Sequence, residues 1–196
     1  MPHKPQKIQK FYIKNMLATC CLQIVRDIME RNAIFLFDIK VGEISIDISN
    51  HPVDMNTLSR LLKPYGMELL QSKEQRIVEE AKQCIIELIH ELNNANSLIR
   101  KSEYLVEKMG MSYQQISKLF SKFEPITIER YSILVKIEKV KELIHSKEYS
   151  LSEIAYMMDY SSVQYLSNQF KKETGYSVTE YKKQGMNLRR SLDQLY

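Results

Sequence analysis

The sequence has no tryptophan and only five glycines and five prolines among its 196 residues. So few turn-forming residues disfavour an all-β fold with many tight turns, whereas the abundant leucine, isoleucine, lysine, glutamate and methionine favour helices. Hydrophobic residues make up 44% of the chain, which is enough for ordinary globular cores. We therefore expect a mainly helical protein with one medium domain or two small ones.

The sequence also lacks an apolar run of the roughly 20 residues that a membrane-spanning helix needs. The basic start from Met1 to Lys10 is not followed by the apolar stretch of a signal peptide. Three cysteines, two of them adjacent and the third (Cys84) within a helical pattern, suggest no disulfide framework. These absences predict a cytoplasmic protein with no membrane partner.

Catalytic motifs are missing as well. The chain has no glycine-rich phosphate loop, no G-x-S-x-G elbow and no paired acid motif, and no histidine lies near the cysteines in sequence. The four histidines are scattered without the spacing of metal ligands. We expect neither an enzyme nor a bound cofactor.

The net charge of +4 is distributed unevenly. Residues 1–95 carry 12 basic and 12 acidic side chains, whereas residues 96–196 carry 16 and 12. All the excess positive charge therefore lies in the second half, where it would assist nucleic-acid binding if the residue pattern points the same way.

Asparagines at positions 93, 94 and 96 interrupt a helical pattern and predict a domain boundary. We expect a domain at 1–71, a connecting helix and linker at 72–96, and a second domain at 97–196. In the first domain, hydrophobic periodicity predicts an α+β domain with the βαββαβ order of a ferredoxin-like sandwich. The expected elements are strand 10–16, helix 20–31, strands 34–39 and 43–48 joined at Gly42, helix 55–62 and a short strand 67–70.

The connecting helix, predicted from Lys73 to Leu92, has one apolar face. Two interpretations remain open, because this stripe could pack against the helix's own domain or could form a dimerisation or interdomain contact. The stripe contains Ile77, Ala81, Cys84, Ile85, Leu88 and Leu92.

Four helix starts in the second half match the capping box, in which a serine and the side chain three residues later each bond the other's backbone N–H. The pairs are Ser112 with Gln115, Ser150 with Glu153, Ser161 with Gln164, and Ser177 with Glu180. The second half is therefore expected to consist of short helices.

Two sets of apolar residues predict two helix-turn-helix units, with left-handed turn residues at Gly110 and Asp159. The turn positions are 49 residues apart but Phe120 and Phe170 are 50 apart, so we expect one extra residue within the second recognition helix. A linker helix is predicted from Ile128 to Ser146. Its length of about 28 Å suits two recognition helices about one DNA turn apart.

The stretch IAYMMDYSSVQYLSNQFKKETGYSVTEYKK resembles the signature of the AraC/XylS family of bacterial transcription regulators. The resemblance covers residues 97–184 and includes both units, the linker helix and the closing segment in the family's order. Two positions depart from the pattern, since Asp159 replaces the usual turn glycine and Lys136 stands where an arginine is common.

This resemblance implies which side chains read DNA. In the first unit they are Gln114, Ser117 and Lys118, flanked by Tyr113, and in the second they are Gln164, Tyr165 and Asn168, with Ser162 near the helix start. Gln and Asn can pair with adenine, and Lys can donate to guanine. Structural alternatives exist for two of them, because Gln164 could serve only as a capping-box partner and Tyr165 could lie partly over the core. Phosphate attraction is assigned to Lys122, Lys171, Lys172, Lys182 and Lys183.

The N-terminal half resembles a heavy-metal-associated domain, whose metal loop reads Met-x-Cys-x-x-Cys. Here Met16 and Cys21 match, Ala18 occupies the position of the first cysteine, and Cys20 is an addition. Adjacent cysteines on a helix point about 100° apart, so no metal site is predicted at Cys20 and Cys21. One interpretation is a scaffold used for dimerisation or for sensing another signal, and the other is a retained metal or thiol-redox response.

These features favour a sequence-specific transcription regulator whose N-terminal domain senses or dimerises. The alternative is a metal- or thiol-handling protein with secondary DNA contact. The expected partners are double-stranded DNA, with a second copy of the chain and an unidentified effector as further candidates.

Overall fold

The computed structural model describes residues 7–49, 52–90, 101–184 and 188–196. The chain divides into two compact units, Met1–Glu80 and Ala81–Tyr196, and the division falls within the helix α3 (Lys73–His90). The sequence-predicted boundary at 93–96 lies outside the described residues. The first part of α3 therefore belongs to the N-terminal unit and the rest to the C-terminal unit.

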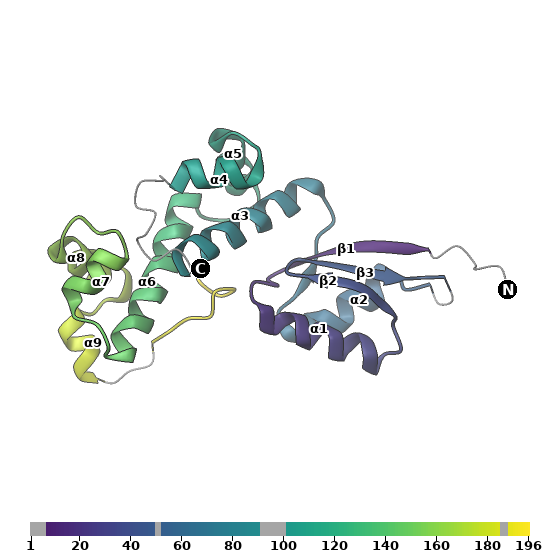
Figure 1. The fold of residues 1–196 in the computed structure, drawn as a ribbon, viewed down its shortest axis with the longest axis horizontal. Helices are drawn as coiled ribbons and strands as arrows, with labels where there is room; N and C mark the ends of the chain where they lie inside the picture. The colour runs from purple at the N-terminus through teal and green to yellow at the C-terminus, as the bar shows by residue number, and fades with distance from the viewer. Residues whose placement is uncertain (1–6, 50–51, 91–100, 185–187) are drawn as a thin grey trace. The chain divides into compact units, whose positions relative to one another are not determined.

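The N-terminal unit contains a four-stranded sheet and two helices before α3 (Figure 1). The sheet order is β2-β3-β1-β4, and every neighbouring pair is antiparallel. The elements are β1 (Ile8–Lys14), α1 (Thr19–Arg31), β2 (Leu36–Lys40), β3 (Glu43–Asp47), α2 (Met55–Leu62), the short 3-10 helix η1 (Lys63–Tyr65) and β4 (Glu68–Leu69).

The strand β1 begins and ends two residues before the predicted strand. It stops because Asn15 adopts a left-handed backbone conformation with φ 63°, which few residues other than glycine and asparagine tolerate. The Asn15 side chain donates to the Gly66 carbonyl (2.9 Å), so this turn is held from a distant part of the chain. Met16 then leaves the strand and is fully buried in the core.

One face of the sheet carries the core of this unit. Phe11 and Ile13 from β1 and Ile44 and Ile46 from β3 are buried against apolar residues of both helices. The alternate residues of β1 point to the opposite face, as the period of two in a strand requires. The helical part of this core consists of Val25, Ile28 and Met29 of α1 and Leu58 and Leu62 of α2.

The described residues of the C-terminal unit form helices and the non-helical segment 188–196, and α6 (Ile128–Ser146) spans the predicted linker helix. Figure 1 shows α4 and α5 at one end of α6, and α7, α8 and α9 at the other. The remaining bounds are α4 (Lys101–Met109), α5 (Tyr113–Phe123), α7 (Leu151–Met157), α8 (Val163–Thr174) and α9 (Val178–Gln184). Among the described residues, no helix is long and apolar enough to cross a membrane.

Three of the four predicted capping boxes are present, and the one predicted at Ser161 with Gln164 is wrong. Ser112 and Ser150 each form the reciprocal pair of bonds, as does Ser177 with Glu180. The helix α8, however, is capped by Ser162, whose hydroxyl accepts from the Tyr165 backbone N–H (3.1 Å). Gln164 therefore lies inside the first turn of α8 and is not a capping-box partner.

The left-handed turn residues are where the repeat predicts them, with φ 61° at Gly110 and 52° at Asp159. The extra residue of the second unit does not enter its recognition helix, which corrects the prediction. The cap Ser112 follows Gly110 by two positions, whereas the cap Ser162 follows Asp159 by three. The turn absorbs the insertion, so the two recognition helices keep the same register.

Candidate nucleic-acid interface

The helices α5 and α8, which the sequence predicts as recognition helices, are two copies of one pattern, 50 residues apart. Their N-caps, Ser112 and Ser162, and their fully buried phenylalanines, Phe120 and Phe170, have this same separation. Burial repeats position by position between residues 113–122 and 163–172, so both helices bury one stripe and expose the same remaining positions. Each helix therefore presents a comparable polar face.

On α5 the side chains of Gln114, Lys118 and Lys122 are exposed, and Ser117 is half-buried. Tyr113 is half-buried because its hydroxyl donates to Glu129 Oε1 of α6 (2.5 Å). Burial and this hydrogen bond raise the pKa of Tyr113 above its ordinary value. Tyr113 thus anchors the start of α5 to α6, while the exposed side chains remain available to a ligand.

On α8 the predicted residues are exposed, and two of them are joined. Gln164 Nε2 donates to Asn168 Oδ1 (2.9 Å), as residues four apart on one helix face can. The pair holds the two amides side by side. Lys171 and Lys172 are also exposed in the last turn of the helix.

Tyr165 is 55% exposed, with its ring 5.8 Å from that of Tyr160. The ring of Tyr165 therefore leans on the edge of the core but is not covered by it. Its role next to DNA stays a prediction. Tyr160 itself is buried, and its hydroxyl donates to Gln169 Oε1 (2.7 Å) on the inner side of α8.

The recognition faces carry no exposed carboxylate. The helix α5 has no acidic residue, and the single one of α8, Glu173, has a side chain only 3% exposed that is bonded to Arg130. Lys118, Lys122, Lys171 and Lys172 are exposed on the same helices. At the end of α9, Lys182 and Lys183 are exposed as well. A polyanion approaching these faces would meet cations without carboxylate repulsion.

Lys136, a departure from the family pattern, supports the second unit from α6. Its buried ammonium group donates to the Met158 carbonyl (2.5 Å), which lies beside the Asp159 turn. The same nitrogen lies 4.8 Å from the centroid of the Tyr160 ring, within range of a cation–π interaction. A lysine can therefore hold this turn.

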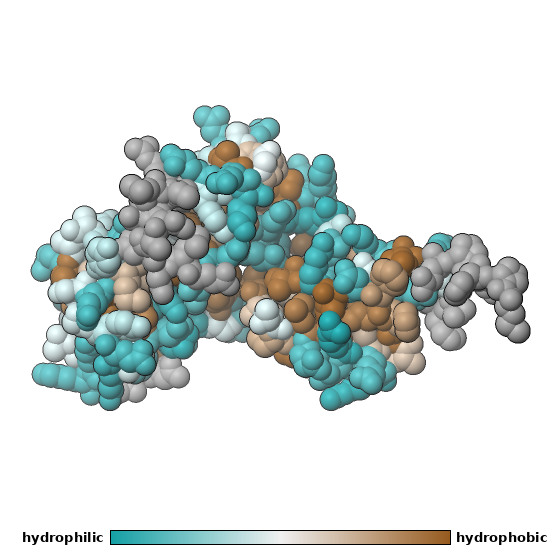
Figure 2. All heavy atoms as spheres, viewed as in Figure 1, coloured by the Kyte–Doolittle hydropathy of each residue, from teal (hydrophilic) through white to brown (hydrophobic). Residues whose placement is uncertain are grey.

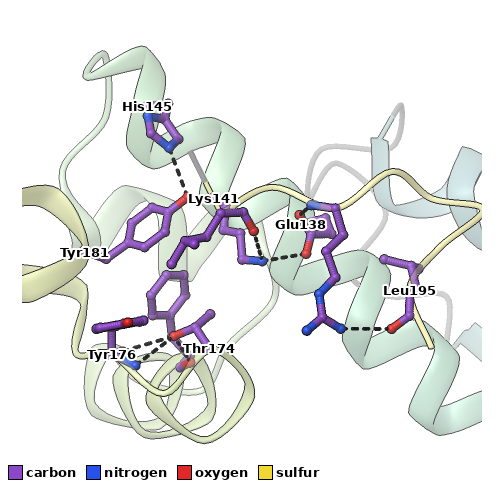
Figure 3. Close-up of polar contacts among 10 residues, drawn as sticks. Glu138, Lys141, His145, Thr174, Tyr176, Tyr181 and Leu195 are labelled. Carbon is purple, nitrogen blue, oxygen red and sulfur yellow. Dashed lines mark hydrogen bonds and ion pairs between the residues drawn. The ribbon is translucent and has the colours of Figure 1, made fainter. Parts of the chain in front are cut away.

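Sequence reasoning missed other contacts that position the unit, most of which join residues far apart in sequence. Within α6, Lys141 donates to Glu138 (2.6 Å) (Figure 3). Lys141 also donates to the Leu188 carbonyl (2.9 Å), and the Arg190 backbone N–H donates to Glu138 (2.9 Å). His145 Nε2 lies 2.9 Å from the Tyr181 hydroxyl. The segment 188–196 is thereby fastened along α6.

The first helix pair is completed by α3. Lys82 pairs with Glu124 at 2.7 Å, and both side chains are only 5% exposed. The Tyr196 hydroxyl donates to the other oxygen of Glu124 (2.5 Å), and Lys82 lies 5.9 Å from the Tyr131 ring. Three separate segments therefore meet behind the first recognition helix.

The thiols of the N-terminal unit are not gathered into a metal centre. Cys20 is exposed, Cys21 is half-buried against the core, and Ala18 is the N-cap of α1 without a side-chain capping bond. Within the described ranges, no group of three or more His, Cys, Asp or Glu side chains is arranged to hold a metal ion.

Comparison with known proteins identifies a family that matches part of the chain. The helix-turn-helix domain family matches residues 105–184. The xylose operon regulatory protein of Escherichia coli K12 is 26% identical over 125 residues, which are 64% of this chain and 32% of that protein. This chain thus spans about a third of the length of that curated relative.

Two solved structures are also similar. The C-terminal domain of AraT, a response regulator from Geobacillus stearothermophilus, is 27% identical, with a TM-score of 0.48 over 61% of this chain and 94% of that one. A DNA-binding transcriptional dual regulator from Escherichia coli K-12 is 19% identical, with a TM-score of 0.45 over 53% and 90% of the two chains.

The matched family region contains α5, α6, α7 and α8, and it also contains the residues on which the AraC/XylS resemblance rests. The left-handed turns, the serine caps and the buried phenylalanines all lie within it. Residues 105–184 of this chain are a helix-turn-helix domain of the AraC type.

Proposed function

We propose that this chain is a sequence-specific DNA-binding transcription regulator that places α5 and α8 in two successive major grooves of one duplex. The repeated burial pattern of the two helices, in register at a separation of 50 residues, carries the proposal. Their common support α6 is about 28 Å long, close to the roughly 34 Å between successive major grooves.

The exposed side chains have the chemistry to read base edges. Gln164 and Asn168 present adjacent amides that suit adenine. Lys118, at the position of α5 equivalent to Asn168, is a donor that suits guanine. The two half-sites are therefore expected to differ in sequence. Lys122, Lys171 and Lys172 lie toward the ends of the helices, where charge attracts phosphates without selecting a sequence.

The test is enrichment of duplexes from a random double-stranded DNA pool by the full chain, followed by footprinting of one enriched duplex. Two protected half-sites about one helical turn apart are expected, with affinity that falls steeply as salt rises. Lys118→Ala should relax base preference in one half-site and Asn168→Ala in the other. Protection of a single half-site, or no enrichment, contradicts the proposal.

We further infer that the N-terminal unit is a ferredoxin-like sandwich that joins two copies of the chain through β2. The element order and the sheet order β2-β3-β1-β4 support the sandwich, and β2 is a sheet edge. Phe35, just before β2, and Phe37, within it, are 65% and 52% exposed. Figure 2 shows apolar side chains gathered on the visible face of this unit.

Charge on β2 favours a second copy as the partner. In an antiparallel pair of β2 strands centred on Ile39, Asp38 of each copy would lie opposite Lys40 of the other, which is a favourable cross-strand pair. Sedimentation of the full chain tests this. Asp38→Lys should shift the protein towards monomer, and adding Lys40→Asp should restore the dimer. Glu68→Lys on the opposite edge strand β4 is the control that should change nothing. A monomeric wild-type protein contradicts this inference.

A further inference from the structure

Two adjacent residues in the first turn of α6 contact both recognition helices. Glu129 accepts from Tyr113, the first residue of α5, and Arg130 Nη1 donates to Glu173 Oε1 near the end of α8 (2.5 Å). One helical turn is thus connected to the start of one recognition helix and to the end of the other.

The Arg130–Glu173 pair is asymmetric in its exposure to solvent. The Glu173 side chain is 3% exposed and Arg130 is 42% exposed. A carboxylate buried to this extent needs a cation or several hydrogen bonds, because desolvation disfavours its charge. Arg130 satisfies that need from α6. The contact therefore keeps the end of α8 close to the first turn of the linker helix.

Arg130 lies outside the apolar contact between α6 and the second helix pair. The buried α6 residues of that core run from Ile137 to Ile144, and the partly buried Ile133 also packs against it. Arg130 precedes Ile133 by three residues, or about 4.5 Å along the helix. The Lys136 contact with Met158 lies beside the core. Without Arg130, the end of α8 would lose its ion pair with the first turn of α6.

The geometry points to Arg130, acting through Glu173, as a positioning residue that sets the spacing of the two DNA half-sites. This role rests on the proposed DNA-binding function, and it would make binding selective for one spacing between the half-sites. A second unit fixed to α6 at two points along the axis cannot pivot, so the two recognition helices hold one separation and one rotation. One inserted base pair shifts a half-site by about 3.4 Å and turns it by about 35°, which a rigid pair cannot follow.

The test measures affinity of the full chain for the enriched duplex and for duplexes with one base pair inserted or deleted between the half-sites. Wild-type protein should prefer the enriched spacing by about tenfold or more, the penalty of a displaced base contact. Arg130→Gln and the near-isosteric Glu173→Gln should reduce that preference to less than about threefold, mainly by better binding of the altered spacings relative to the original. Reversal of the pair, Arg130→Glu with Glu173→Arg, should restore selectivity.

A matched control is Arg189→Gln, which removes an ion pair with Glu142 (3.1 Å) elsewhere on α6 and should leave spacing preference unchanged. Circular dichroism shows which variants are folded. If Arg130→Gln is unfolded, Glu173→Gln provides the test instead. Unchanged spacing preference in a folded variant, equal loss of affinity at every spacing, or failure of the reversed pair overturns the positioning role while DNA binding stands. Absence of any enriched duplex with wild-type protein overturns the proposed function and this role together.

Discussion

Lys118 and Asn168 occupy the same position on two copies of one motif, each six residues after the serine that caps its recognition helix. Both side chains are exposed, and each follows by four residues an exposed glutamine, Gln114 or Gln164. The two copies place this side chain at the same point of the helix but differ in its chemistry, since it is a cation in α5 and an amide in α8. The two units can therefore read different bases with the same backbone.

Base reading and phosphate attraction on α8 should separate when Asn168→Ala is compared with Lys172→Ala. Loss of the Asn168 amide should cost about 1 to 3 kcal/mol on the enriched duplex and little on random DNA. Loss of Lys172 should weaken both similarly and reduce the slope of log affinity against log salt by up to about one. Titrations at several salt concentrations measure both effects. Equal weakening on both DNAs by Asn168→Ala would show that α8 is misplaced as a base reader.

The C-terminal part should need α3 for full stability. A fragment from residue 73 retains Lys82, the partner of Glu124, whereas a fragment from residue 97 leaves this buried carboxylate without its cation. We expect the shorter fragment to be less stable by about 3 kcal/mol, the lower end of the cost of breaking a buried pair. Urea denaturation of both fragments gives the difference. Lys82→Met in the longer fragment is the control that separates the lost charge from the lost apolar contacts. Equal stability of the two fragments would contradict this dependence.

The contact of Tyr113 with Glu129 should depend on pH. The hydrogen bond from Tyr113 lowers the pKa of Glu129 below its ordinary value despite a partial opposing effect of burial. A lowered carboxyl pKa contributes stability above the unfolded pKa of about 4.3, and that stability is lost as pH falls through the folded pKa. Tyr113→Phe should therefore raise the pKa of Glu129 and cost about 1 kcal/mol near pH 7. The difference from wild-type stability should vanish below the folded pKa. NMR titration of Glu129 and urea denaturation check both parts, and a difference that persists at low pH refutes the assignment.

Metal binding at the N-terminal unit should be weak in the wild-type chain and stronger after Ala18→Cys. The substitution puts a thiol at the N-cap of α1, three residues before Cys21 and at the position where the resembled metal loop has its first cysteine. Competition of the protein with a chelator for copper(I) or zinc measures the change. Ala18→Ser is the matched control, since it offers a capping hydroxyl without a thiolate. Tight binding by wild-type protein, equal to that of Ala18→Cys, would show that Ala18 is not the missing ligand position.

Much of the helical unit could be predicted from sequence because its signals are local. A serine followed three residues later by glutamine or glutamate marks a helix start through bonds within one turn, as at Ser112 and Ser150. Glycine tolerates the left-handed turn at position 110, and aspartate tolerates it at 159. The bounds of α6 were predicted from its apolar periodicity, although the helix buries more than one face, since Val135, Lys136 and Glu138 are buried beside Ile137.

The second recognition helix shows where local signals become ambiguous. Ser161 and Ser162 are neighbours, and the capping-box pattern favoured the first. In the structure Ser162 is the cap, while Tyr160, just before the two serines, is buried with its ring beside Lys136 and near that of Tyr165. Tertiary packing thus decided the start of α8 and brought its register into agreement with α5.

The sequence by itself determined the two helix pairs, the linker helix and which polar positions of α5 and α8 are exposed, because each depends on residues within a few turns of one another. Only the tertiary structure decided how these parts are held. The Lys82–Glu124 pair, the Arg130–Glu173 pair and the fastening of segment 188–196 along α6 join residues more than 40 positions apart. No local pattern specifies such pairs, since the fold must first bring the two distant partners together before their charges can interact.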